Sequence, residues 1–205
     1  MAKEKHFRIL LGSSICASLF ILLISISRWT LVDVVTPFIE PIIELAFWIL
    51  AIIVMVWSFV YMLTHIIKTR FNAVMPFLIV AITLLISIFA PFTKWITDYD
   101  FYSNYEERLA VVKQIQSGQM NVNDANIIPL PKESKHLSKG GGEVMYWSND
   151  NKSFGVLFFT FRGVLDNYSG FAYKSDNNEP SSMDFDSDNI EIRKLREHWY
   201  WISSS

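Results

Sequence analysis

The chain has 205 residues, of which 51% are hydrophobic, and a formal net charge of −2 at pH 7. From Asp98 onward it carries eleven Lys or Arg and sixteen Asp or Glu. This half has no basic face that could displace counterions from a nucleic-acid backbone, so we expect no nucleic-acid partner. The only cysteine, Cys16, lies in an apolar run, which excludes an intramolecular disulfide and leaves the second half without a thiol.

Three apolar runs fill the first half of the chain, at residues 9–27, 45–67 and 71–93. A helix of about 20 apolar residues is long enough to cross the hydrocarbon core of a bilayer. None of the runs has the polar stripe that an amphipathic core helix would show. We therefore predict three membrane-spanning helices and a membrane domain over residues 1–97, with the lipid bilayer as its partner.

The distribution of basic residues predicts the direction of these spans. Basic residues precede the first span and separate the second from the third: Lys3, Lys5, Arg8, Lys68 and Arg70. The connection between the first two spans has Arg28 alone, beside three acidic residues. Because basic loops stay on the cytoplasmic side, we predict a multi-pass protein of the inner or plasma membrane with a cytoplasmic N-terminus. The half that follows the third span is then extracytoplasmic, and Trp29 and Trp95 are expected at the outer interface.

Two alternative interpretations concern the first half. The first apolar run follows a basic start, and Ser25-Ile26-Ser27 has the form of a signal-peptide cleavage site. Cleavage there would leave the second half on the same side, because the second span would still run from outside to inside. The other alternative is a pore or transporter subunit. Such proteins usually carry ionisable residues deep in their spans; none lies deep here, and three spans would line a pathway only in an oligomer.

Residues 98–205 are predicted to form an extracytoplasmic α+β domain. Ser103 and Glu106 have the spacing of a capping box, and the apolar residues that follow predict a helix at 104–117. Prolines and the glycine run at 140–142 then indicate a loop that holds one short strand at 127–130.

Strand-forming residues dominate the rest of the chain. Three runs are rich in β-branched and aromatic residues: 143–147, 154–161 and 170–174. The second run is nearly all apolar, which is typical of a strand buried on both faces. Residues 176–189 are predicted to form an exposed acidic loop, and 190–202 a final strand or strand pair with Trp199 and Trp201 on one face. The predicted fold class is thus a membrane protein with an all-α part of three helices and a C-terminal α+β domain, whose antiparallel sheet has four or five strands.

Three segments of the second half resemble the C-terminal part of small bacterial multi-pass membrane proteins that are described as uncharacterised. The segments are HLSKGGGEVMYW, VLFFTFRGVLDNYSGFAYKSD and the closing HWYWIS. The resemblance covers residues 105–202. It implies a bacterial envelope protein, and it implies no reaction, ligand, cofactor or catalytic residue.

Charged and aromatic residues meet at the turn that follows residue 161. Arg162 and Asp166 flank this turn, where an arginine fork can hold a carboxylate, and Tyr168 follows. One interpretation is an intramolecular ion pair that closes the strand connection. The other is a polar cluster of Arg162, Asp166 and Tyr168 that binds a ligand or a partner peptide. The neighbouring rings are typical of a sheet core.

Two further motifs depart from the binding patterns that they resemble. The glycine run at 140–142 opens a strand and lacks the Lys and the Ser or Thr of a phosphate loop, so it predicts a turn. The aspartates at 184, 186 and 188 have the spacing of a calcium loop, but Asn189 stands at the glycine position and Leu195 at the bidentate glutamate position. We predict no metal and no cofactor.

His136 and His198 are the histidines of the second half and are candidate binding residues. Each lacks a second ligand nearby in the sequence, so a zinc site is not predicted. A membrane-tethered hydrolase would use one of them with a carboxylate or with an exposed serine, for which Ser138, Ser153 and Ser169 are the candidates. The sequence has no nucleophile-elbow motif, and enzyme activity is the less favoured interpretation.

The function expected from these features is protein binding at the membrane surface. The extracytoplasmic domain is predicted to be ordered and aromatic-rich, and its sequence shows no catalytic constellation. We expect it to engage an envelope or secreted protein, as an immunity or accessory factor, and oligomerisation is compatible with this plan. A membrane-tethered hydrolase and a subunit of an oligomeric pore or transporter are the alternatives.

Overall fold

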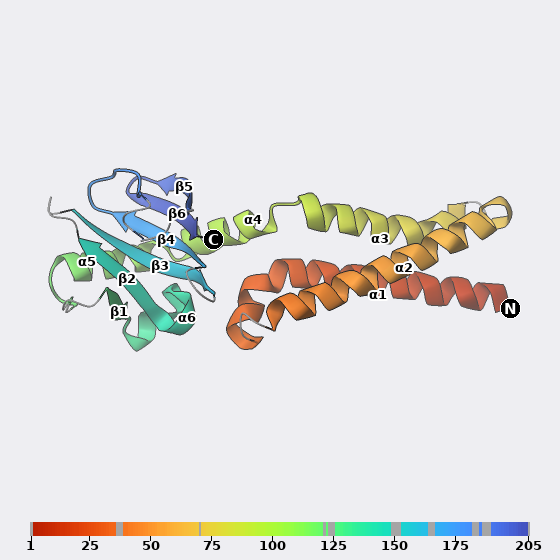
Figure 1. The fold of residues 1–205 in the computed structure, drawn as a ribbon, viewed down its shortest axis with the longest axis horizontal. Coiled ribbons are helices and arrows are strands. Elements are labelled where there is room, and N and C mark those ends of the chain that lie inside the picture. Colours follow the sequence, from red (N-terminus) through yellow and green to blue (C-terminus); the bar gives the residue numbers. More distant parts are fainter. Residues whose placement is uncertain are drawn as a thin grey trace. The chain divides into compact units, whose positions relative to one another are not determined.

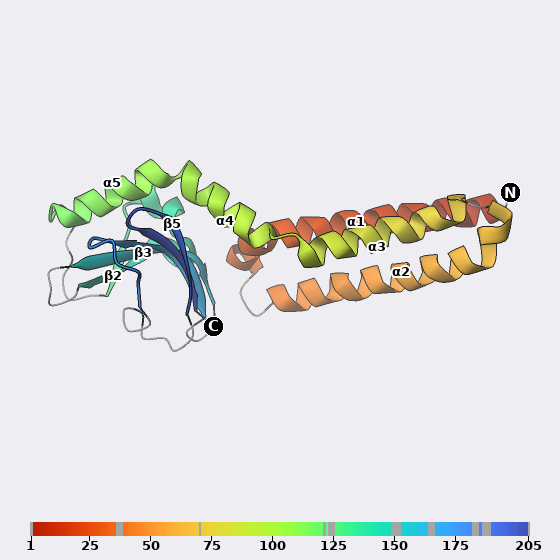
Figure 2. The same ribbon diagram turned by 90° about the horizontal axis from the view of Figure 1, so that it is seen from above.

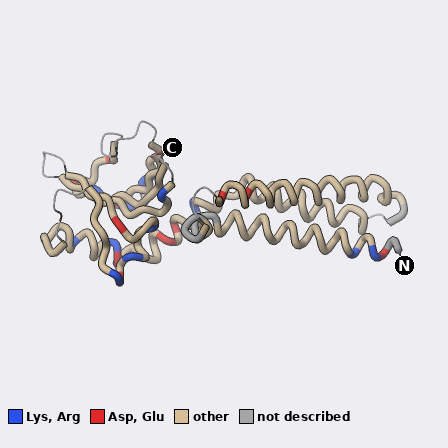
Figure 3. The backbone as a smooth tube through the Cα atoms, turned by 60° about the horizontal axis from the view of Figure 1, so that its bottom comes forward, with Lys and Arg blue, Asp and Glu red and all other residues tan. Residues whose placement is uncertain are grey.

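The computed structural model describes residues 2–35, 39–69, 71–120, 122, 126–148, 153–163, 167–181, 185 and 190–204. The chain divides into two compact units, Met1–Lys94 and Trp95–Ser205. Figure 3 shows few charged residues along the three long helices of the first unit, whereas Lys, Arg, Asp and Glu are frequent in the second.

The first unit is a bundle of three helices, α1 (Ala2–Val35), α2 (Glu40–Thr69) and α3 (Phe71–Phe89), each of which contacts the other two (Figure 1). All three are long and apolar enough to cross a membrane, with windows at Glu4–Ser27, Glu40–Ile67 and Phe71–Phe89. This confirms the three apolar helices that the sequence predicts.

Small side chains share the centre of this bundle with larger ones such as Leu10 and Ile21. Ala17, Ala51 and Ala73 are buried, and the hydroxyls of Ser14 on α1 and Ser58 on α2 lie 3.2 Å apart in a buried hydrogen bond. Large apolar side chains are instead exposed on the outside of all three helices. This arrangement is typical of helices that pack closely through small residues and turn their large side chains to lipid.

The helices differ in length from the predicted spans. Most of the predicted connection between the first two spans is helical, because α1 continues to Val35 and α2 begins at Glu40. The third helix is shorter than predicted and ends at Phe89, just before Pro91. Pro91 has no backbone N–H to donate to the preceding turn, and its ring disfavours the α conformation of the residue before it. Both effects end the helix here.

Helix α4 (Phe92–Ser103) occupies the segment for which the sequence predicts a short connector. Ser103 is its last residue, so the predicted capping box is wrong. The next helix, α5 (Tyr105–Gln116), follows Asn104, whose side chain makes no capping hydrogen bond to it. Asn104 Nδ2 donates back to Asp100 in α4. The predicted helix at 104–117 is therefore confirmed, with a different start.

The second unit contains an antiparallel sheet of six strands within the described residues, in the order β1-β2-β3-β4-β6-β5. The strands are β1 (Ile127–Pro129), β2 (Glu143–Ser148), β3 (Phe154–Arg162), β4 (Tyr168–Lys174), β5 (Ile190–Arg196) and β6 (Trp199–Ser204). The predicted number of four or five strands is wrong, because the short first strand pairs with β2 and 190–204 contributes two strands. The strand pair, one of the two alternatives predicted for residues 190–202, is confirmed.

A 3₁₀-helix, η1 (Lys132–Leu137), and a helical turn, α6 (Lys139–Gly142), connect β1 to β2 in place of the predicted loop. Gly140 has φ of 72° and Gly142 of 71°, in the left-handed region that favours glycine. Chain direction thus changes over this run, and β2 begins directly after it.

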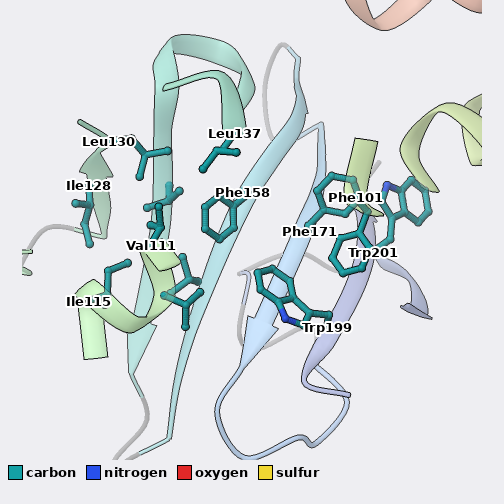
Figure 4. Packing of buried hydrophobic residues seen from close by; sticks show 13 residues of the cluster. Phe101, Val111, Ile115, Ile128, Leu130, Leu137, Phe158, Phe171, Trp199 and Trp201 are labelled. Carbon is teal, nitrogen blue, oxygen red and sulfur yellow. The ribbon is translucent and has the colours of Figure 1, made fainter. Parts of the chain in front are cut away.

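Helix α5 lies across one face of the sheet (Figure 2). The core between them includes Val112, Val144, Phe158 and Phe171, all at most 1% exposed. In Figure 4, Phe101 of α4 lies close to Phe171 and Trp199 of the sheet. Trp199 and Trp201 belong to this one cluster, as the sequence predicts.

The opposite face of the sheet has its own apolar cluster. Leu157, Phe159, Tyr200 and Ile202 are buried there, together with Phe185 from the connection between β4 and β5. Neighbouring residues of β3 therefore belong to different cores, which confirms that this strand is buried on both faces. We call this second face the Phe159 face.

Candidate functional site

The predicted site residues Arg162 and Tyr168 are register partners at the end of the β3–β4 pair. Arg162 Nη1 donates a hydrogen bond of 2.8 Å to Glu143 Oε2 on β2. The Arg162 guanidinium also lies 5.1 Å from the centroid of the Phe159 ring. Tyr168 meets the same ring edge-on, with 6.0 Å between the centroids. We call Arg162, Glu143, Phe159 and Tyr168 the Arg162 cluster.

A β-bulge explains why these four side chains share one face. The β3–β4 register shifts between Phe159 and Phe161, which inserts one extra residue into β3. In a regular strand, Arg162 and Phe159 would point to opposite faces because they are three positions apart. The extra residue turns Arg162 to the Phe159 face, where Tyr168 and Glu143 also lie by their register.

Two neighbours fix the position of this end of the sheet. A Cβ on Gly140 would lie 3.0 Å from Cβ of Arg162, so the glycine lets the α6 turn approach the arginine closely. Ser138, only 2% exposed, accepts a hydrogen bond from the Phe159 amide and donates one to the Glu143 carbonyl oxygen. The segment that leads into β2 therefore contacts the cluster and helps to hold it in place.

The cluster combines a partly exposed cation, anion and tyrosine ring with the buried ring of Phe159. The side chains of Arg162 and Glu143 are 40% and 37% exposed. Since arginine has five donors in a planar fork, it can bind a carboxylate or carbonyl of a partner in addition to Glu143. The Tyr168 hydroxyl donates to the Phe185 carbonyl oxygen at 3.3 Å. These groups suit recognition, and none of the four residues is a serine, cysteine or histidine.

The third residue of the predicted cluster, Asp166, lies outside the described residues, as does the predicted Arg162–Asp166 ion pair. Sequence reasoning missed Glu143 as the partner of Arg162. The two residues are 19 positions apart, and only the antiparallel pairing of β2 with β3 brings them together. The available signal was the position of Glu143 at the start of a predicted strand that pairs with the end of β3.

The structure places the two candidate histidines in different local settings. His136 lies on η1, with Nε2 3.1 Å from Glu107 Oε2 and Nδ1 2.9 Å from the Glu133 carbonyl oxygen. His198 forms the turn between β5 and β6 with φ of 65°. Its Nδ1 lies 2.8 Å from the Lys174 carbonyl oxygen and its ring stacks on Tyr173. These contacts are typical of residues that hold connections in place.

Two of the serines that a hydrolase could use also have structural partners. Ser138 makes the two backbone hydrogen bonds described above. Ser169 is 1% exposed, and its hydroxyl lies 2.8 Å from that of Thr160, the residue within the bulge. Both hydroxyls are thus engaged inside the sheet, and neither has a histidine among these partners.

Arg108 is a buried charge that sequence reasoning missed. It lies on the apolar face of α5 with 1% exposure, and its Nη2 pairs with Asp100 Oδ2 at 2.6 Å. It also donates to the carbonyl oxygens of Leu137 and Asp100. Burial lowers the pKa of the Arg108 guanidinium, while the charge of Asp100 opposes this shift. Its position four residues before Val112 could have placed it on the buried face.

The described residues contain no group of three or more His, Cys, Asp or Glu side chains that could hold a metal ion. The acidic triplet at 184, 186 and 188 lies outside the described part of the chain. Comparison with family models, with curated proteins and with solved structures finds no match. The resemblance to small bacterial membrane proteins over residues 105–202 stays a prediction.

Proposed function

We propose that this chain is an integral membrane protein whose second unit binds another protein at the membrane surface, through the Arg162 cluster. The observation that carries the proposal is the partly exposed Arg162–Glu143 pair beside the rings of Phe159 and Tyr168. An arginine with spare donors next to aromatic rings is a combination that is enriched in the energetic centres of protein interfaces. An immunity or accessory factor has this plan of membrane anchor and recognition domain.

The contacts of the candidate catalytic histidines and serines support binding over catalysis. The described contacts of His136 and His198 are with backbone carbonyls, a carboxylate and a ring. The hydroxyls of Ser138 and Ser169 are engaged within the sheet. A hydrolase needs a nucleophile within hydrogen-bond reach of a base, and these contacts favour a structural role for all four residues.

We further propose that the second unit is extracytoplasmic in a bacterial cell membrane. The start of α1, the end of α2 and the start of α3 lie at the same end of the bundle (Figure 1). Both basic segments of the first unit therefore meet the same side of a bilayer, and the positive-inside rule makes that side cytoplasmic. The buried contact of Ser14 with Ser58 supports retention of α1 in the mature protein.

A photo-crosslinking experiment tests the binding proposal. A benzophenone amino acid would replace Asn167, an exposed residue that directly precedes Tyr168. We expect one envelope or secreted protein to be captured in intact cells, and we expect Arg162→Ala to abolish the capture. Arg162→Lys, which keeps the charge but loses the fork, should capture less than the native chain.

The matched control places the same probe at Lys113, an exposed residue on α5, the helix that covers the other face of the sheet. It should not capture that protein. If the crosslinked product from position 167 persisted undiminished in Arg162→Ala, the Arg162 cluster would not be the binding surface, and the proposal would fail.

A further inference from the structure

Helix α4 carries three exposed aromatic side chains, Trp95, Tyr99 and Tyr102, which we call the aromatic stripe. Their exposed fractions are 57%, 77% and 57%. The residues are four and three positions apart, so they lie on one face of the helix. Single exposed aromatic residues are common on protein surfaces, but a row of three marks an interaction surface.

The opposite face of α4 is fixed in the second unit. Thr97 and Phe101 are 3% and 0% exposed, and the Phe101 ring lies 5.3 Å from Phe171, centroid to centroid (Figure 4). Two ion pairs also hold this face of α4: Asp100 with Arg108 at 2.6 Å, and Asp98 with Arg193 at 2.7 Å. The angle in the second pair does not suit a hydrogen bond, so that contact is purely electrostatic. The Tyr102 hydroxyl also donates to the Leu195 carbonyl oxygen of β5 at 3.4 Å, while its ring stays 57% exposed. Since these contacts set the rotation of the helix about its axis, the exposed sides of the three rings are held on one outward face.

The chain also keeps the stripe close to a membrane span. Helix α3 ends at Phe89, and α4 begins at Phe92 after a tight turn in which the Phe92 amide donates to the Ala90 carbonyl oxygen at 2.8 Å. The proline in this turn interrupts the helix. Helix α4 therefore need not continue along the axis of the span.

The length of α4 decides which direction brings the whole stripe to lipid. Its 12 residues correspond to roughly 18 Å at 1.5 Å per residue. The interfacial layer of a bilayer is only about 5 to 8 Å thick on each side. If α4 ran along the bilayer normal, Tyr102 would lie well beyond this layer. All three rings reach the layer only if the helix lies along the surface.

We propose that α4 lies in the plane of the membrane surface, with the aromatic stripe inserted in the interfacial layer of the bilayer. Tryptophan and tyrosine are enriched at this depth because their rings are apolar and their N–H or O–H groups reach water. The stripe itself is uncharged, so its contact with lipid requires no anionic headgroups. The span that precedes α4 keeps lipid within reach whether or not a protein partner is present.

Spin labels on the full chain test this proposal. In a Cys16→Ser background, Tyr99→Cys, Tyr102→Cys and, as control, Lys113→Cys would each carry a nitroxide, and the chain would be placed in phosphatidylcholine vesicles. The measured quantity is the ratio of relaxation by oxygen, which concentrates in lipid, to relaxation by a water-soluble nickel complex. We expect this ratio to be severalfold higher for the labels at 99 and 102 than for the label at 113. This ratio should be the same at about 0.1 M and about 1 M salt, because screening leaves contacts of uncharged rings unchanged.

Two tryptophan substitutions test the same proposal without a spin label, which could itself disturb the structure. Tyr99→Trp preserves an aromatic ring, and its added emission should be quenched by brominated phosphatidylcholine, whereas that of Lys113→Trp should not. Equal access of the nickel complex to positions 99 and 113, with no quenching at 99, would place the stripe in water and overturn the proposal. Spin–spin broadening at 99 that disappears on dilution with unlabelled chain would show a second copy on the stripe and overturn it as well.

Discussion

Arg108 sits in the core of the second unit because its neighbours satisfy its charge. Its guanidinium pairs with Asp100 and lies 4.5 Å from the centroid of the Phe171 ring. We expect Arg108→Met, which keeps an apolar stem, to lower the free energy of unfolding by about 3 kcal/mol. This is the low end for breaking a buried pair, because the remaining carboxylate of Asp100 is 37% exposed and can be hydrated.

Urea unfolding of the full chain in detergent micelles, followed by the near-ultraviolet circular dichroism of its tryptophans, measures this loss. Asp100→Asn is the matched variant. It keeps an acceptor for Arg108 but removes the charge, so the buried guanidinium loses its counter-ion, and it should lower the free energy of unfolding by about 3 to 5 kcal/mol. A loss in Asp100→Asn well below that in Arg108→Met would mean that the carbonyl acceptors, and not the carboxylate of Asp100, compensate the charge of Arg108.

Tyr173 makes the stability of the second unit sensitive to alkaline pH. Burial, with a smaller effect of Tyr105, raises the pKa of Tyr173 above its ordinary value of 10.0. At a pH above about 10 the unfolded chain releases this proton while the folded chain still holds it, so folding loses stability as the pH rises. We expect Tyr173→Phe to lose less stability than the native chain over this range, as measured by urea unfolding at each pH. Parallel curves for the two chains would contradict this.

At the level of elements, sequence patterns predict a helix or strand correctly where its burial depends only on its own residues. The three spans and most strands follow from long apolar runs, which fix their own environment. Helix α4 was missed because its buried residue Phe101 contacts Phe171 and Trp199, some 70 and 98 positions later, and no local pattern reports such contacts. The same reason hides Glu143 as the partner of Arg162, since the β-bulge that turns Arg162 to the Phe159 face depends on strand register.

The register of α1 against α2 is also a property of elements that can be measured directly. The hydroxyl oxygens of Ser14 and Ser58 lie 3.2 Å apart, so in a Cys16→Ser background we expect Ser14→Cys with Ser58→Cys to form a disulfide on mild oxidation in membranes. Val56 is 52% exposed on the outside of α2, so Ser14→Cys with Val56→Cys is the matched control that should not crosslink. A faster crosslink with position 56 would mean that α2 is rotated about its axis relative to this structure.

Considered as a whole, the molecule joins two units with opposite rules of burial. The first unit buries small and hydroxyl side chains such as Ala17 and Ser14 beside a few apolar ones, and it exposes most of its large apolar side chains. The second hides rings such as Phe158 and Trp199 and carries most of the charge. Each rule matches one solvent, lipid or water, so the change near Lys94 and Trp95 is expected to coincide with the membrane boundary. Which aqueous side the second unit occupies depends on the loop charges alone.

Reporter fusions decide that side. An odd number of spans, with Lys68 and Arg70 between the last two, predicts that residue 205 lies across the membrane from those two basic residues. In a bacterial host, alkaline phosphatase fused after Ser205 should be active, because its disulfides form only outside the cytoplasm, and a green fluorescent protein at that position should be dark. Fusions after Thr69, at the end of α2, should behave in the opposite way. Fluorescence after Ser205 without phosphatase activity would place the Arg162 cluster in the cytoplasm, where it could not meet a secreted partner.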